Sequence, residues 1–273
     1  MFARLSAASA AALLAAAPAH ALTSFATTTY FAGFETDLDG WQDFNGSGVS
    51  RTAGGYEGAW HGVATGGATS FNGPYSTMGG YSSVWTGDWA VQTAIYLDPA
   101  WTTGAGFEYS VAASGSDGDH QRDFVFSVAR DVGALRVNAS NNSTGNGNGA
   151  PTNLAGQTEP PSESITAAGW YVFEHVFRDV AGLLAVEMNV YASGDLSTAV
   201  FTETRGPHPD DQIPLAVGGN RYAWFATVDL PGGVAFDSVR MTESFSAVPV
   251  PAALPLLAGG VGLLGLLRLR RRT

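Results

Sequence analysis

Apolar and polar residues alternate along much of the chain, and long runs with a helical period are rare. One alternating run, residues 89–97, places on one face the side chains of Trp89, Val91, Thr93, Ile95 and Leu97. Successive side chains of a strand point to opposite faces, so this run predicts a strand with one buried face. Similar runs predict further strands at 83–86, 106–112, 199–204, 221–228 and 234–242.

Two pairs of strand-like runs are joined by short turn sequences that begin with Asp. The first pair joins residues 124–130 to 134–138, and the second joins residues 170–178 to 183–191. Asp and Gly are favoured in tight turns, and here they lie between β-branched and aromatic runs. Both pairs are therefore predicted to form β-hairpins.

The order of these elements favours an all-β fold. Short strands follow one another through Gly-, Ser- and Asn-rich turns, and no helix is long enough to connect parallel strands. We therefore predict an antiparallel two-sheet β-sandwich of the jelly-roll or concanavalin-like type. Residues 138–153 and 157–164 are predicted to be loops, and residues 246–251 a Pro-rich spacer.

The first 21 residues have the order of a secretory signal peptide. Arg4 supplies a positive charge, residues 7–17 form an Ala/Leu run, and small residues flank His20 at the end. A signal peptidase reads small residues at those two positions, so we expect cleavage after Ala21. Export of the following domain is the consequence.

A second apolar stretch, residues 251–267, is followed at once by Arg268, Arg270, Arg271 and Arg272. A helix of this length spans roughly 25 Å, at the short end for a bilayer. Positive charge stays on the cytoplasmic side, so the preceding domain is expected to face outward from the inner membrane. The predicted organisation is a signal peptide (1–21), an exported domain (22–246) and a C-terminal segment with a transmembrane helix (247–273).

The exported domain is strongly acidic and contains no cysteine. It holds eight arginines, no lysine and all 24 acidic residues, which gives a net charge of −16. Such a surface repels nucleic acid, whose binding requires a basic patch. The absence of cysteine excludes thiol catalysis and stabilisation by disulfides, so the domain must depend on its own core.

An acidic loop between two predicted strands is a candidate cation site. It runs from Ser114 to Asp123 and contributes the carboxylates of Asp117, Asp119 and Asp123. Calcium prefers several oxygen ligands from a flexible loop, which makes a calcium site one interpretation. The other is a solvated turn, because the spacing lacks the later ligands and the flanking helices of an EF-hand.

Aromatic residues crowd the first half of the domain and suggest a sugar-binding surface. Trp41, Trp60 and Tyr75 lie in loop-like contexts, where exposed rings are able to stack on sugars. The alternative for each is packing into the core, which is the usual place of aromatic residues on strands.

No catalytic motif is present in the sequence. Glu174 and Glu187 lie on strands of one predicted hairpin and are candidates for the two carboxylates that glycoside hydrolysis requires. The Glu-x-Asp-x-x-Glu pattern of laminarinase-like sandwich hydrolases is absent, and the simpler interpretation is that Glu174, His175 and Glu187 face outward on half-exposed strands. Motifs of zinc hydrolases and serine hydrolases are also absent.

The C-terminal segment resembles the PEP-CTERM sorting signal, specifically its Val-Pro-Leu-Pro-Ala variant. The resemblance rests on Val248-Pro-Val-Pro-Ala-Ala-Leu-Pro, the Gly/Leu run and the arginine tail. It implies a Gram-negative bacterium, processing by an exosortase near Pro249 and Pro251, and release from a transient inner-membrane anchor to the cell surface or extracellular matrix. Proteins with such signals are associated with exopolysaccharide.

The exported domain more weakly resembles the jelly-roll domains that precede such signals. Residues 34–41 are similar to their first strand and turn, and residues 234–242 to their last strand. The favoured interpretation is a non-enzymatic surface or matrix protein that binds carbohydrate with calcium support. The alternatives are a polysaccharide-active hydrolase or lyase and a purely structural matrix subunit.

Overall fold

The computed structural model describes residues 21–67, 72–80, 85, 87–115, 120–141, 162–205, 217–218 and 222–244. Within these ranges the secondary structure is entirely β. The strands are β1 (Thr27–Ala32), β2 (Gly48–Ala53), β3 (Trp60–Thr65), β4 (Tyr75–Ser76), β5 (Trp89–Leu97), β6 (Gly106–Gly115), β7 (His120–Arg130), β8 (Leu135–Asn141), β9 (Ser162–Ile165), β10 (Gly169–Val180), β11 (Leu183–Ala192), β12 (Ala199–Arg205), β13 (Val217–Gly218), β14 (Ala223–Asp229) and β15 (Val234–Glu243).

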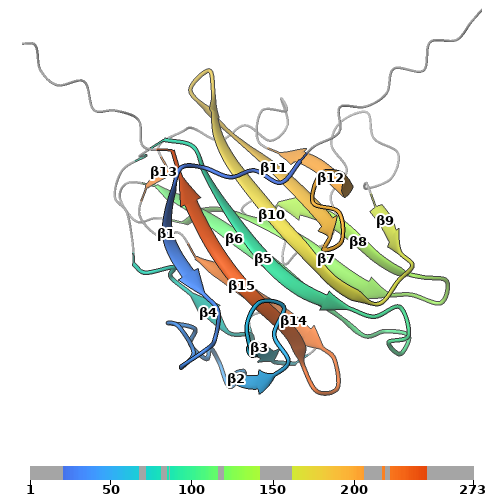
Figure 1. The fold of residues 1–273 in the computed structure, drawn as a ribbon. Helices are drawn as coiled ribbons and strands as arrows, with labels where there is room; N and C mark the ends of the chain where they lie inside the picture. Colours follow the sequence, from blue (N-terminus) through green and yellow to red (C-terminus); the bar gives the residue numbers. More distant parts are fainter. Residues whose placement is uncertain are drawn as a thin grey trace, which may run out of the picture.

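The strands form two antiparallel sheets that pack face to face (Figure 1). The eight-stranded sheet has the order β12-β11-β10-β5-β15-β3-β2, with β1 beside β15. The seven-stranded sheet has the order β4-β14-β6-β7-β8-β9, with β13 beside β6. The prediction of an all-β fold with two antiparallel sheets is confirmed.

The core lies between the two sheets and follows the alternation seen in the sequence. On β5 the predicted apolar face is the one that faces the core, although Ala90, Gln92 and Ala94 on the other face are buried as well. On β10 the core-facing residues include Phe173 and Phe177. Trp89 of β5 stacks on Phe177, with ring centroids 3.7 Å apart and planes 3° from parallel. Burial of large rings from neighbouring strands is the main stabilisation expected for a domain without disulfides.

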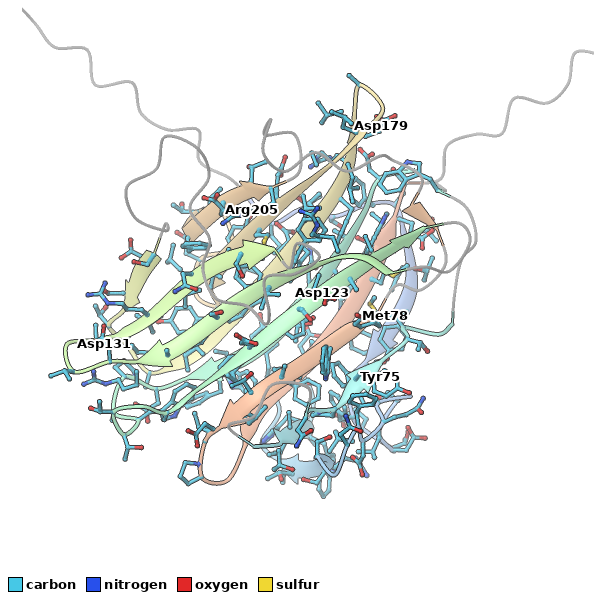
Figure 2. All side chains as sticks on the ribbon, turned by 180° about the vertical axis from the view of Figure 1, so that it is seen from behind. Tyr75, Met78, Asp123, Asp131, Asp179 and Arg205 are labelled. Atoms are coloured by element: carbon cyan, nitrogen blue, oxygen red, sulfur yellow. The ribbon has the colours of Figure 1, made fainter. Side chains whose placement is uncertain are left out.

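Both predicted hairpins are confirmed. Arg130 pairs with Leu135 at the end of β7 and β8, and Val180 pairs with Leu183 at the end of β10 and β11. Figure 2 shows Asp131 and Asp179 at the tips of these hairpins. Each Asp carboxylate accepts the N–H of the Gly two or three residues later, which is why these sequences turn where they do.

Three local predictions are wrong. The predicted loop 138–153 begins later than expected, because β8 continues to Asn141, which pairs with Phe124 of β7. Residues 34–41 form a loop, and the first strand is β1, because Phe34 has a φ of 57° and Asp39 accepts the N–H groups of Gly33 and Phe34. The predicted loop 157–164 ends earlier than expected, because β9 begins at Ser162 and pairs with β8.

The predicted signal peptide before Ala21 and the predicted anchor after residue 246 lie outside the described residues. Of the predicted strand at 83–86, the structure describes only Trp85. In the part of the chain that the structure describes, no helix is long and apolar enough to cross a membrane.

Candidate functional site

Among the described residues, the outer face of the eight-stranded sheet carries a group of aromatic rings and buried polar side chains. On β10, residues with odd numbers from 171 to 177 point into the core, so the even-numbered residues point outward. The outward set therefore includes Trp170, Val172 and Glu174. On β5, which pairs with β10, Gln92, Ala94 and Tyr96 point the same way.

An aromatic cluster surrounds Trp170 on this face. The centroid of its ring lies 5.9 Å from the ring centroid of Tyr56, 5.8 Å from that of His61 and 5.7 Å from that of Tyr96. Trp170 and Tyr96 are direct partners on β10 and β5, while His61 comes from β3 and Tyr56 from the preceding loop. Trp170, Tyr56 and Tyr96 are each half-buried, so none of the three residues is enclosed in the core. We call these four residues the Trp170 platform.

The charge state of the platform is set by burial. His61 is 9% exposed, and burial lowers the pKa of its imidazole below the usual 6.5. The ring is therefore neutral at pH 7 and presents an aromatic face without a positive charge. Burial likewise raises the pKa of Tyr56 above its usual value of 10.0, which keeps its hydroxyl protonated.

A small hollow adjoins the platform. Its volume is about 60 Å³, and it is lined by Leu22, Tyr56, Glu57, Gln92, Ala94, Val172, Leu196, Ser238 and Arg240. Val172 of β10 pairs with Ala94 of β5, and this pair lies two residues from the pair of Trp170 and Tyr96 on the same two strands. The platform and the hollow are thus continuous on one face of the sheet, with Tyr56 belonging to both.

Farther along this face, Glu174 is buried beneath the segment that precedes β1. Its exposed fraction is 0%, and Oε1 accepts the Thr23 N–H at 2.7 Å and the Gln92 amide at 3.0 Å. Oε2 accepts the Asn189 amide at 3.0 Å and the Tyr191 hydroxyl at 3.1 Å. Burial nevertheless raises the pKa of this carboxyl above its usual value, and the four hydrogen bonds oppose the rise.

Figure 1 shows the segment before β1 crossing the front of β10 and β5. Besides the Thr23 bond to Glu174, the Leu22 N–H donates to the Leu196 carbonyl at 2.9 Å. The Gln92 amide also donates to the Thr23 carbonyl. The segment thereby closes one side of the hollow.

The two carboxylates considered for hydrolysis do not form an accessible pair. Glu174 and Glu187 do point to the same outer face, since Glu174 pairs with Asn189 and Glu187 with Val176. However, Glu174 is covered, and Glu187 accepts from Arg178 Nε at 3.2 Å. The expectation of half-exposed strands fails here because the segment before β1 covers Glu174.

The expectation that His175 faces outward is also wrong. Like the other odd-numbered residues of β10 from 171 to 177, His175 points into the core. It is fully buried and contacts the rings of Tyr109 and Phe126. Nε2 lies 2.9 Å from the Phe124 carbonyl oxygen. Burial lowers the pKa of His175 to about 3, so the buried ring is neutral.

The three aromatic residues singled out from the sequence occupy different places. Trp41 is 3% exposed and packs against Phe225 and Phe236 in the core, so its ring is enclosed and does not reach a ligand. Trp60 is not in a loop, because it is the first residue of β3 and pairs with Ala53 of the edge strand β2. It is 37% exposed, and the Arg51 guanidinium lies 4.6 Å from its ring.

Tyr75, labelled in Figure 2, belongs to the other sheet. The ring of Phe44 lies 6.0 Å from Tyr75 and 5.9 Å from Trp224, and Phe44 is 41% exposed. These three rings form a second aromatic group, which lies apart from the Trp170 platform because β4 and β14 belong to the seven-stranded sheet.

Of the three predicted calcium ligands, Asp117 and Asp119 lie outside the described residues. Asp123 lies on β7, is 6% exposed and accepts the Tyr222 hydroxyl at 2.9 Å (Figure 2). Among the described residues no group of three or more acidic or histidine side chains is placed to hold a metal ion.

Sequence reasoning missed the Trp170 platform. The alternation of residues 170–178 places Trp170 on the face opposite Phe173 and Phe177, which is a signal for an outward-facing ring. The convergence of β3, β5 and β10 at this point is a long-range property of the sheet order and has no counterpart in local sequence.

Comparison with solved structures finds likeness at low identity, whereas no protein-family model and no curated protein matches the chain. A carbohydrate esterase from Shiga toxin-encoding bacteriophage phi24B is 12% identical with a TM-score of 0.50, covering 80% of this chain and 99% of its own. The CBM2 module of the evolved Dit of Lactobacillus casei BL23 phage J-1 is 11% identical with a TM-score of 0.46, covering 81% and 96%. The exoplasmic/lumenal domain of VIP36, bound to Ca²⁺ and Man3GlcNAc, is 10% identical with a TM-score of 0.45, covering 81% and 90%. At such identity the likeness concerns the fold alone, a two-sheet β-sandwich.

Proposed function

We propose that the protein is an exported, non-enzymatic carbohydrate-binding protein that uses the Trp170 platform to hold a sugar chain. The single observation that carries the proposal is that Trp170, a partly exposed residue, is flanked by three further rings whose centroids lie 5.7–5.9 Å from its own. Aromatic rings offer a flat apolar face, which suits the C–H face of a pyranose, and the polar groups beside them bind hydroxyls.

The polar surroundings of the platform support this proposal. Glu57, Gln92 and Arg240 line the adjoining hollow and supply both donors and acceptors of hydrogen bonds. Sugar recognition commonly combines an apolar surface with a few placed polar groups, as other small-molecule sites do. The enclosed position of Glu174 argues against a hydrolytic role for the pair Glu174 and Glu187, because a catalytic acid must reach its substrate.

The proposed location follows from the two ends of the sequence. A signal peptidase removes residues 1–21, and an exosortase-type enzyme processes the tail near Pro249 and Pro251. The domain then leaves the inner membrane for the cell surface or matrix of a Gram-negative bacterium, where exopolysaccharide is its partner. Mass spectrometry of the exported protein tests this, with an N-terminus at Leu22 and a C-terminus near residue 249 as the expected result.

We also propose that a bound calcium ion supports the carbohydrate-binding domain. This proposal rests on the three acidic residues of the loop before and at the start of β7, namely Asp117, Asp119 and Asp123. We expect the midpoint of thermal unfolding to rise when calcium is added to protein treated with a chelator. An unchanged midpoint would remove calcium from the proposal and leave the aromatic site untouched.

A glycan array with the purified full-length protein tests the binding function directly. A detergent without a sugar head group is required, since an alkyl glycoside would itself occupy a sugar site. We expect Trp170→Ala to lose at least tenfold in affinity for the glycans that the unaltered protein binds. Phe44→Ala, in the second aromatic group, is the matched control and should bind as the unaltered protein does.

Absence of binding to every neutral and charged glycan on the array would contradict the proposal and favour a purely structural subunit. Unchanged binding by a folded Trp170→Ala protein would show that the platform is not the site. Loss of binding in Phe44→Ala alone would move the site to the group formed by Phe44, Tyr75 and Trp224.

A further inference from the structure

Ser238 lies at an unusual point of β15 and lines the hollow beside the Trp170 platform. The pairing between β15 and β5 slips between Asp237 and Arg240, which is a β-bulge. Within this bulge Ser238 has a φ of 49°, a left-handed conformation that residues other than Gly, Asn and Asp rarely adopt. Conformations of this kind are costly and recur at binding sites, where the fold holds them in place.

The hydroxyl of Ser238 is buried without a partner. Only 7% of the residue is exposed, and Oγ has no hydrogen-bond partner in the part of the chain that the structure describes. Its own N–H is satisfied by Asp237 Oδ1 at 2.7 Å, so the backbone of the bulge is fixed while the side chain is not engaged. A buried polar atom without a partner carries a desolvation penalty, which a ligand hydroxyl in the hollow would relieve.

The remaining walls of the hollow limit what can enter. Ala94 and Val172 form an apolar base, and Ala94 leaves the space because its side chain is small. A volume of about 60 Å³ is far below the roughly 300 Å³ of a pocket that encloses a whole small molecule. The hollow therefore accommodates a single substituent, while the body of the ligand remains outside on the platform.

The two charged residues that line the hollow, Glu57 and Arg240, have opposite charges. Glu57 Oε2 lies 3.6 Å from Arg240 Nη2, and both side chains are partly exposed, at 52% and 39%. The pair adds no net charge at the mouth of the hollow, and the whole domain carries a net charge of −16. A polyanionic glycan would be repelled by this surface, so the balance favours an uncharged sugar.

We propose that the hollow receives the exocyclic hydroxymethyl group of a neutral hexopyranose whose ring stacks on Trp170, with Ser238 Oγ as its hydrogen-bond partner. This inference rests on the proposed carbohydrate-binding function and adds a specificity to it. Pentopyranose polymers lack the hydroxymethyl group, and they leave the hollow empty and Ser238 unpaired. The protein therefore distinguishes hexose polymers from pentose polymers of the same linkage.

Calorimetric titration of the full-length protein with matched oligosaccharides tests the inference. The probes are gluco-, manno- and galacto-oligosaccharides on one side and xylo-oligosaccharides on the other. We expect at least one hexose series to bind at least tenfold more tightly than the xylose series. Ser238→Ala should reduce the hexose affinity at least fivefold and leave the xylose affinity within twofold.

Ser140→Ala is the matched control, because Ser140 is also buried, and its Oγ likewise has no partner among the described residues, but it lies on β8 in the other sheet. Ala94→Val provides a second test, since it fills the hollow without removing a polar group and should lower the preference for hexose. Thermal unfolding of each variant verifies that it folds.

The outcomes separate the two proposals. Equal affinity for the hexose and xylose series, or unaltered hexose binding by a folded Ser238→Ala protein, would overturn the inference and leave carbohydrate binding intact. Failure of the unaltered protein to bind any of these sugars or any array glycan would overturn both.

Discussion

The backbone N–H of Thr23 donates a 2.7 Å hydrogen bond to the carboxylate of Glu174, although 151 residues separate them in the sequence. This bond holds the segment before β1 against the outer face of the eight-stranded sheet. It also explains how a glutamate on an outward-facing position is fully buried. The same segment reaches Leu196 through Leu22, and these two residues close the hollow beside the Trp170 platform.

Replacement of Glu174 by Gln should destabilise the domain. The carboxylate accepts from four donors, two on each oxygen. A Gln side chain has one acceptor oxygen, and its NH₂ group would face two of the donors. We expect the free energy of unfolding to fall by about 1–3 kcal/mol, measured by chemical denaturation at pH 7.

Glu187→Gln is the control for this substitution. Glu187 lies on the neighbouring strand, and its side chain is 25% exposed in an ion pair with Arg178. Partly exposed ion pairs contribute little, so a change within about 0.5 kcal/mol is expected. A Glu174→Gln protein as stable as the unaltered protein would show that the segment before β1 is not held by this carboxylate.

The parts of the fold that local chemistry determines could be predicted from the sequence. Both hairpins were predicted because an Asp that caps its own turn separates two alternating runs, as Asp131 and Asp179 do. The core-facing side of β5 followed from its alternation. β9 was missed, since Ser162–Ile165 is short, mostly polar and recognisable as a strand only through its pairing with β8.

Asp131 should remain ionised to unusually low pH. Its carboxylate accepts the Ala134 N–H, the Arg136 side chain and the Gly133 N–H, and these bonds lower its pKa to about 2. Because the folded pKa is lowered, the stabilisation is present above the usual value near 4 and is lost as the pH falls toward 2. Carboxyl-detected NMR titration should give a midpoint near 2.

Arg136→Gln tests the cause of that shift. Removal of the guanidinium, which lies 2.8 Å from Oδ2, should move the Asp131 midpoint upward while the bonds from Ala134 and Gly133 keep it below the usual value. A midpoint near 4 in the unaltered protein would show that the turn does not hold the carboxylate as described.

The candidate site was much harder to predict than the fold. The surroundings of Trp41 in the sequence resemble a loop, which makes it a candidate for an exposed ring, yet a loop residue can fold back into the core, and Trp41 does so against Phe236. Ser238 gave no signal, because a bulge and a left-handed φ arise from strand pairing rather than from residue type. Local pattern assigns faces to residues within a strand, whereas a binding site depends on which strands become neighbours.

Gly62 on β3 should not tolerate a larger side chain. A Cβ at this position would lie 2.8 and 2.9 Å from atoms of the Phe236 ring and 2.9 Å from the Phe34 ring. These rings pack edge to face in the core with centroids 4.9 Å apart, so one of them must move. Gly62→Ala should lower the free energy of unfolding by about 1–3 kcal/mol, as overpacking does.

Gly67→Ala is the matched control, because a Cβ there meets nothing within 4 Å and the backbone is not left-handed. Its free energy of unfolding should change by no more than about 0.5 kcal/mol. Equal effects of the two substitutions in denaturant titration would contradict the packing described for Phe34 and Phe236.

His175 should make the domain sensitive to mild acid. Burial lowers its pKa to about 3 in the folded state, whereas an unfolded histidine titrates near 6.5. Below pH 6.5 the unfolded chain therefore binds a proton that the folded chain does not, and the free energy of unfolding falls as the pH decreases. The raised pKa values of Glu174, Glu108 and Asp237 act in the opposite direction, since those groups take up protons more readily when folded.

A comparison with His175→Gln isolates the histidine from these carboxyls. Gln can still donate to the Phe124 carbonyl, which lies 2.9 Å from Nε2, but it does not titrate. We expect the stability difference between the unaltered protein and the variant to shrink by up to about 1.4 kcal/mol per pH unit between pH 6 and pH 5. A difference that stays constant over this range, measured by urea titration at each pH, would mean that His175 becomes protonated without unfolding, in conflict with its burial against Tyr109 and Phe126.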